Sequence, residues 1–165
     1  MIVRQGARAD WAALREVRLA ALADAPAAFA STLDLEREFD DAEWQRRAGA
    51  APWFAAWDGT ELAGLVVVLA PDADRPGWHL VSMWASPKVR GRGVADQLVA
   101  AATGYIREQC GARVMLWVAD ENERAQGFYR RAGFRPTGNR QAYRRADGST
   151  LDEAEFARDL QGVSP

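Results

Sequence analysis

The chain has 165 residues, of which 48% are hydrophobic, and this suits one domain with a sizeable core. Its formal net charge of −2 at pH 7 argues against a broad nucleic-acid-binding surface, so no nucleic-acid partner is expected. The single cysteine, Cys110, excludes an intrachain disulfide and a cysteine-rich zinc site, and no apolar run is long enough for a membrane span or a signal peptide. We therefore expect one domain over residues 1–165, located in the cytoplasm, with no metal and no membrane contact.

The first fifty residues are expected to form one short strand followed by helices. Asp10 and Asp41 belong to the residue types favoured at helix N-caps, and Pro26 interrupts the helical pattern after the first helix. The expected elements are a strand at residues 2–5 and helices at about 10–23, 26–35 and 41–47.

The rest of the chain alternates strands and helices, with no internal repeat and no linker. Asp58-Gly59 between two apolar runs is a strong hairpin signal, and Gly111 is the expected left-handed residue after the longest helix. The expected strands cover residues 53–57, 61–69, 78–85, 113–119, 134–144 and 153–160, and the helices cover 93–109 and 123–132. This order predicts a mixed sheet with helices on both faces, in which the strands before and after the 93–109 helix are parallel.

Residues 88–95, Lys-Val-Arg-Gly-Arg-Gly-Val-Ala, lie where a strand turns into a helix. The two glycines let the backbone approach a ligand closely, and the helix N-terminus offers unpaired N–H groups and a partial positive charge. These features favour phosphate or pyrophosphate binding, although a glycine turn of this kind can also be purely structural. The segment is not a Walker A loop, because no Gly-Lys-Ser/Thr follows.

Two blocks in this order resemble the GNAT superfamily of acyl-coenzyme A-dependent N-acetyltransferases. Residues 83–95 are similar to the family's fourth strand and its pyrophosphate loop, Gln/Arg-x-x-Gly-x-Gly/Ala, with Gly91 and Gly93 in place and Lys88 as a mild departure. Residues 116–134 are similar to the fifth strand and the next helix, which typically read L-x-V…N-x-x-A…F-Y-x-x-x-G-F. The resemblance covers nearly the whole chain and is weakest over the first fifty residues.

The resemblance implies an α/β fold with a central, mixed, mostly antiparallel sheet of six to seven strands flanked by helices on both faces. It implies acetyl-CoA as the co-substrate, with the pantetheine arm entering between splayed fourth and fifth strands. It also implies that a backbone N–H of the fourth strand polarises the thioester carbonyl. The implied cofactor-binding residues are Met83, Trp84, Ala85, Arg90, Gly91, Arg92, Gly93, Val94, Ala95 and Asn122.

Tyr129 occupies the family's general-acid position, where a phenol can protonate the departing thiolate, although it can also simply pack against Phe128. Asn122 is expected to contact the pantetheine arm, to cap the helix that follows, or to do both through different atoms. A general base is harder to assign. His79 has a suitable intrinsic pKa but can equally be structural, and a water held by Ser82 is the alternative.

The acceptor is expected to be a primary amine on a small molecule or a peptide, attacking directly in a ternary complex. Family position suggests that Phe29, Ser31 and Thr32 line its entrance. Glu36 belongs to an acidic run over residues 34–43, which either attracts a cationic amine or forms a solvated helix face. A homodimer is common in the family. The competing interpretation is a non-catalytic acyl-CoA-binding sensor, since fold alone cannot select the function.

Overall fold

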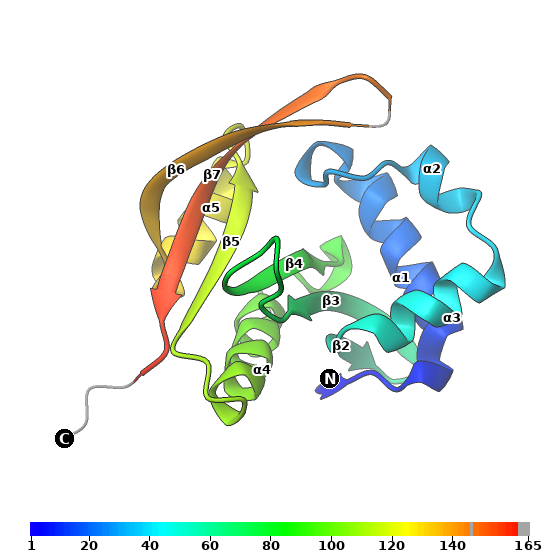
Figure 1. Ribbon diagram of the computed structural model, residues 1–165. Helices are drawn as coiled ribbons and strands as arrows, with labels where there is room; N and C mark the ends of the chain where they lie inside the picture. The colour runs from blue at the N-terminus through cyan, green and yellow to red at the C-terminus, as the bar shows by residue number, and fades with distance from the viewer. Residues whose placement is uncertain (146, 162–165) are drawn as a thin grey trace.

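The computed structural model describes residues 1–145 and 147–161 of the chain (Figure 1). Its helices are α1 (Trp11–Asp24), α2 (Leu33–Arg37), α3 (Asp41–Ala50), α4 (Val94–Glu108) and α5 (Glu123–Arg131). Its strands are β1 (Ile2–Gln5), β2 (Trp53–Asp58), β3 (Glu61–Leu69), β4 (Trp78–Ala85), β5 (Arg113–Ala119), β6 (Arg135–Arg144) and β7 (Thr150–Asp159). No helix in the described part of the chain is both long and apolar enough to cross a membrane.

The seven strands form one sheet in the order β1-β2-β3-β4-β5-β7-β6. All neighbouring pairs are antiparallel except β4 and β5, which are parallel and flank α4 in the sequence. The expected α/β fold with a mixed, mostly antiparallel sheet is therefore confirmed. The β4–β5 ladder is short, because it pairs only Trp78 with Val114 and His79 with Met115. Beyond these residues the two strands diverge, as Figure 1 shows.

Helices pack on both faces of the sheet because adjacent residues of the buried strands point to opposite sides. Phe54 and Val66 join a core cluster with Leu98 and Ile106 of α4. Ala55 and Leu65, their sequence neighbours, belong to a second cluster formed with α1. The near-continuous apolar sequence of β2 and β3 follows from this burial on both faces.

The expected helix at residues 26–35 is wrong. A short 3-10 turn covers Pro26–Ala28, the backbone is extended at Phe29, and α2 begins only after Thr32. The Thr32 hydroxyl accepts a hydrogen bond from the Leu35 N–H at 3.3 Å and so caps the helix at this point. The connection between α1 and α2 therefore contains no α-helix over residues 25–32.

Other boundaries shift by a few residues. Asp40, rather than Asp41, is the N-cap of α3, with its side chain accepting from the Glu43 N–H at 2.8 Å. Asp10 precedes α1 but its carboxylate accepts from the Ala7 N–H instead of capping that helix. The last strand begins at Thr150 rather than at residue 153, because its pairing with β6 extends to the turn between them.

The left-handed residue after α4 is Cys110, with φ 60°, and not Gly111. Gly111 is needed for a different reason, since a Cβ there would lie 2.3 Å from the Ile106 side chain. Because a non-glycine residue at positive φ costs roughly 1–2 kcal/mol, we expect Cys110→Gly to raise the free energy of unfolding by about 1 kcal/mol. Denaturant unfolding measures this, and a lower stability in the variant would contradict it.

Candidate active site

A cleft of about 630 Å³ opens where β4 and β5 diverge. Four parts of the chain line it: the end of β4, the loop into α4, helix α5, and the connection between α1 and α2. Of the residues implied by the family resemblance, the cleft brings together Phe29, Met83, Trp84, Ala85, Arg90, Gly91, Gly93, Val94, Ala95, Asn122 and Tyr129. Arg92, Ser31, Glu36 and His79 do not line it.

The divergence of the strands coincides with a β-bulge in β4. The register with β3 shifts between Leu65↔Trp84 and Val67↔Val81, which leaves one extra residue on β4. Ser82 at this point has φ 58°, in the left-handed region. A bulge bends its strand and increases the local twist. Beyond it, β5 offers no ladder partner to residues 83–85, so this backbone edge faces the cleft.

The loop between β4 and α4 is shaped by its two glycines. Gly91 and Gly93 have φ 78° and 75°, and nothing lies within 4 Å of a Cβ built on either. The glycines are therefore required by backbone conformation rather than by crowding. Gly93 is the N-cap of α4 and offers no side-chain cap, so the first N–H groups of a 15-residue helix remain available to an anion.

Arg90 connects this loop to the end of α1. Its Nε donates to the Ala85 carbonyl oxygen at 2.9 Å, and its Nη2 forms an ion pair with Asp24. The Trp84 Nε1 donates to the same carboxylate at 2.9 Å. Burial opposes ionisation of Asp24, but the hydrogen bonds from Trp84 and Arg90 outweigh it and lower the pKa of that carboxyl. Arg92 instead points to Asp58 at 3.6 Å.

Two cleft arginines, Arg124 and Arg131, were not identified from the sequence. They lie seven residues apart on α5 and therefore on one face of the helix, on either side of Tyr129 in the sequence. The signal that could have found them is this helical spacing within the second family-like block. With Arg90 they give the cleft three arginines against two carboxylates, Asp24 and Asp96, and Arg90 is already paired with Asp24.

Helix α5 positions both Asn122 and Tyr129. The Asn122 Oδ1 caps the helix by accepting from the Ala125 N–H at 3.1 Å, which leaves its amide nitrogen available. The Tyr129 ring packs against Phe128 and Phe134, with centroids 5.3 and 5.6 Å apart. Burial raises the pKa of Tyr129, so its hydroxyl is protonated throughout the neutral range. The phenol thus lines the cleft as a hydrogen-bond donor.

His79 lies at the opposite end of β4 from the cleft. Its imidazole is buried, and Nδ1 is 2.9 Å from the Gly77 carbonyl oxygen. Met83 lies four positions further along the strand, roughly 13 Å away. Ser82 is nearer in sequence but also does not line the cleft. This placement favours a structural role for His79 over a role as the general base.

On the acceptor side, Phe29 lines the cleft and its carbonyl oxygen accepts from the Arg145 Nε at 3.1 Å. This bond joins the α1–α2 connection to the end of β6, where the β6–β7 hairpin arches across the molecule (Figure 1). Ser31 and Thr32 lie next to this segment but outside the cleft lining.

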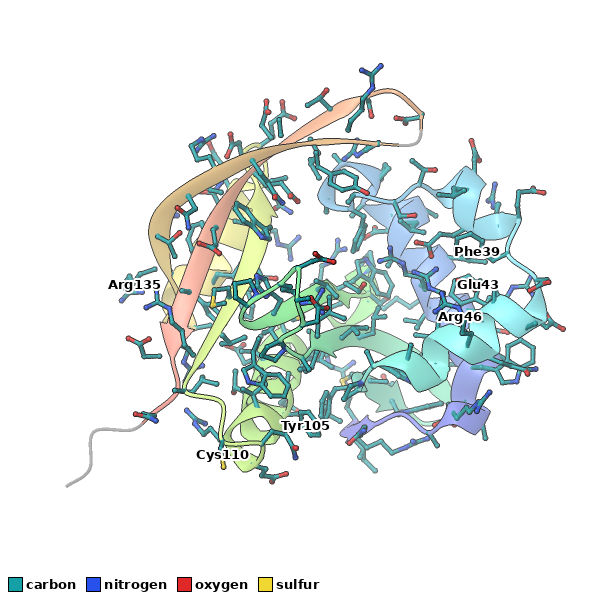
Figure 2. All side chains as sticks on the ribbon, in the orientation of Figure 1. Phe39, Glu43, Arg46, Tyr105, Cys110 and Arg135 are labelled. Carbon is teal, nitrogen blue, oxygen red and sulfur yellow. The ribbon has the colours of Figure 1, made fainter. Side chains whose placement is uncertain are left out.

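Most of the acidic run is a surface feature. Asp34, Glu38, Asp40 and Asp41 are exposed, and Glu43 pairs with Arg46 on α3 at 2.7 Å. Figure 2 shows that pair on the outer helices, away from β5. Glu36 alone is fully buried, in ion pairs with Arg18 and Arg47. Among the described residues, no group of three or more His, Cys, Asp or Glu side chains is arranged to hold a metal ion.

The sequence of the chain is similar to those of known acetyltransferases. The model of the acetyltransferase (GNAT) family matches residues 15–134. Mycothiol acetyltransferase of Salinispora tropica is 30% identical over 99 residues, which are 50% of this chain and 30% of that protein. Peptidyl-lysine N-acetyltransferase YjaB of Escherichia coli is 34% identical over 95 residues, 48% of this chain and 61% of that protein. The chain thus spans less than two thirds of either relative.

Solved structures show the same fold. The protein yncA of Salmonella typhimurium, solved with acetyl-CoA, superimposes with a TM-score of 0.77 over 100% of this chain and 96% of its own, at 18% identity. An acetyltransferase of the GNAT family from Streptococcus pneumoniae gives a TM-score of 0.80 over 97% of this chain and 99% of its own, at 16% identity.

Proposed function

The chain belongs to the acetyltransferase (GNAT) family, and we propose that it transfers the acetyl group of acetyl-CoA to a primary amine. The observation that carries this proposal is the cleft itself. It joins an unpaired strand edge at residues 83–85, a glycine loop at the start of α4, and the buried phenol of Tyr129. Acetyl-CoA is long, polyanionic and reactive at one end. The strand edge suits its extended arm, the glycine loop suits its pyrophosphate, and Tyr129 suits its reactive thioester.

In this proposal the pyrophosphate binds at the loop over residues 90–95, where helix N–H groups and Arg90 meet it. The pantetheine arm lies along Met83, Trp84 and Ala85 as an added strand would, with Asn122 reaching it through the amide nitrogen that the cap leaves free. The structure of yncA with acetyl-CoA supports the choice of ligand, since that protein shares the fold.

The proposed reaction is a direct attack of the neutral amine on the thioester carbonyl. The C–N bond forms, a backbone N–H of β4 stabilises the developing oxyanion, and the C–S bond then breaks as Tyr129 donates its proton to the leaving sulfur. No acetyl-cysteine step is included, because Cys110 is exposed at the far end of α4 from the loop (Figure 2). Cys110→Gly is accordingly expected to keep full turnover.

The amine must lose a proton before it attacks, and the sequence offers His79 or a water held by Ser82 to take it. Since His79 does not line the cleft, we propose that water carries the proton away. His79→Gln is then expected to keep the pH–rate profile of the wild-type enzyme. A variant that loses the ascending limb of the profile near the usual histidine pKa of about 6.5 would assign the base to His79.

The test of this function is an acceptor screen in which thiol release from acetyl-CoA is followed for a panel of primary amines. Lysine-containing peptides are tested first, because YjaB is a peptidyl-lysine N-acetyltransferase, followed by free amino acids, diamines and peptide N-termini. We expect at least one amine to accelerate thiol release and to appear acetylated by mass spectrometry. Tight acetyl-CoA binding with no turnover on any amine would support the sensor function instead.

A further inference from the structure

A buried ionic cluster joins the three N-terminal helices to strand β4. Arg18 of α1 and Glu36 of α2 are 7% and 1% exposed. The Arg18 Nε and Nη2 donate to the Glu36 carboxylate at 3.1 and 2.8 Å, and Arg47 of α3 approaches the same carboxylate at 3.1 Å. The guanidinium of Arg18 is therefore fixed from one side by two hydrogen bonds to a single carboxylate.

The other side of the Arg18 guanidinium contacts the β4 bulge and one cleft-lining side chain. Its Nη1 donates to the Ser82 hydroxyl at 3.2 Å, at the bulge where Ser82 has φ 58°. Its Cζ also lies 4.8 Å from the centroid of the Phe29 ring, which lines the cleft on the acceptor side. One side chain thus connects the cofactor-facing strand with the segment that faces the acceptor.

Neither the buried ion pair nor the left-handed serine is explained by packing alone. Burying two charges carries a desolvation penalty, and apolar residues of similar volume often stabilise a core at least as well. A serine in the left-handed region is strained and persists only when its surroundings hold it. The hydrogen bond between Arg18 and Ser82 joins these two costly features.

We infer that Arg18, held by Glu36, is a positioning residue that fixes the β4 bulge through Ser82. It thereby aims the backbone N–H groups of residues 83–85 at the thioester carbonyl. This inference rests on the proposed function. It assigns a role to Glu36 that differs from acceptor binding, since the carboxylate acts through Arg18 and has no access to the cleft. It also makes the geometry of the reacting centre depend on contacts far apart in the sequence.

The test is the infrared carbonyl stretch of acetyl-CoA, labelled with carbon-13 at the carbonyl and bound to the full chain. Three variants are compared with the wild-type protein. Ser82→Gly removes the hydroxyl but accepts positive φ without strain. The double variant Arg18→Met with Glu36→Met removes both charges together and so avoids an unpaired buried carboxylate. Arg15→Met, on the same helix, removes only the exposed pair with Asp41 and is the matched control.

We expect the wild-type protein and Arg15→Met to shift the bound carbonyl stretch to lower frequency than in free acetyl-CoA. Ser82→Gly and the double variant should each lose more than half of that shift while keeping acetyl-CoA affinity within about threefold. Combining Ser82→Gly with the double variant should reduce the frequency shift no further, because both changes interrupt the same series of contacts from Glu36 through Arg18 to Ser82. A full shift in Ser82→Gly would overturn the inference and leave the proposed function standing. If the wild-type protein binds no acetyl-CoA, both are overturned.

Discussion

Tyr129→Phe should lower kcat by roughly 100-fold or more while changing the dissociation constant for acetyl-CoA little. The substitution keeps the ring that packs against Phe128 and Phe134 and removes only the hydroxyl. Without that hydroxyl the thiolate must leave unprotonated, which raises the barrier to collapse of the tetrahedral intermediate. Steady-state kinetics with the amine found in the screen measures kcat, and calorimetry measures the binding of acetyl-CoA.

Tyr105→Phe is the matched control, because Tyr105 lies on α4, outside the cleft, and packs against Phe54 and Trp78 (Figure 2). It should retain wild-type kcat.

The pH dependence of kcat in the wild-type enzyme gives a second test of the role of Tyr129. A general acid must be protonated to act, and burial raises the pKa of Tyr129, so the descending limb of kcat should lie above the usual tyrosine range. Wild-type kcat in Tyr129→Phe would show that another group protonates the leaving sulfur.

Arg18→Met should lower the free energy of unfolding by about 3–5 kcal/mol. The single change leaves the buried Glu36 carboxylate with Arg47 as its one remaining cationic partner among the described residues. Adding Glu36→Met should restore most of the loss, since it removes the buried carboxylate and leaves without a partner only Arg47, whose side chain is 31% exposed. Chemical denaturation measures both variants.

Arg15→Met again serves as the control, because the Arg15–Asp41 pair is exposed and should contribute at most about 1 kcal/mol. If Arg18→Met lowers the free energy of unfolding no more than Arg15→Met does, the buried Arg18–Glu36 pair does not stabilise the fold. Such a result would also remove the physical basis for a positioning role of Arg18.

The same ion pair makes a part of the stability depend on pH. Burial opposes ionisation of Glu36, but the hydrogen bond from Arg18 and the charges of Arg18 and Arg47 outweigh it and lower its pKa from 4.5. A lowered folded-state pKa contributes stability that is present above the unfolded pKa and is lost as the pH falls through the folded one. The stability advantage of the wild-type protein over Glu36→Gln should therefore be constant near neutral pH and shrink below about pH 4.5.

Sequence alone placed those parts of the site that are local in the chain. Gly91 and Gly93 adopt positive φ directly before a helix, which two glycines at a strand-to-helix turn predict. Asn122 and Tyr129 lie at the start and near the end of one short helix, so a single helical motif brings both to the cleft. The mixed sheet and the parallel β4–β5 pair followed from the alternation of strands and helices, whereas the order of the strands within the sheet was not predicted.

The features that sequence reasoning missed depend on tertiary contacts. The bulge at Ser82 is visible only in its register with β3, and Arg18 reaches it across 64 residues of chain. Glu36 was indistinguishable from its exposed acidic neighbours until the packing of α2 against α1 buried it. Cys110 takes the left-handed position because Gly111 is required for close packing against Ile106, a choice that local preference does not predict.

The most direct test of the account is a calorimetric titration of the wild-type protein with acetyl-CoA, paired with acetyl-pantetheine, which lacks the pyrophosphate and the nucleotide. The cleft between β4 and β5 and the glycine loop predict a dissociation constant for acetyl-CoA on the order of micromolar or below, and a large loss of affinity for acetyl-pantetheine. Absence of acetyl-CoA binding, or equal affinity for the two compounds, would contradict the assignment of the loop and of the cleft.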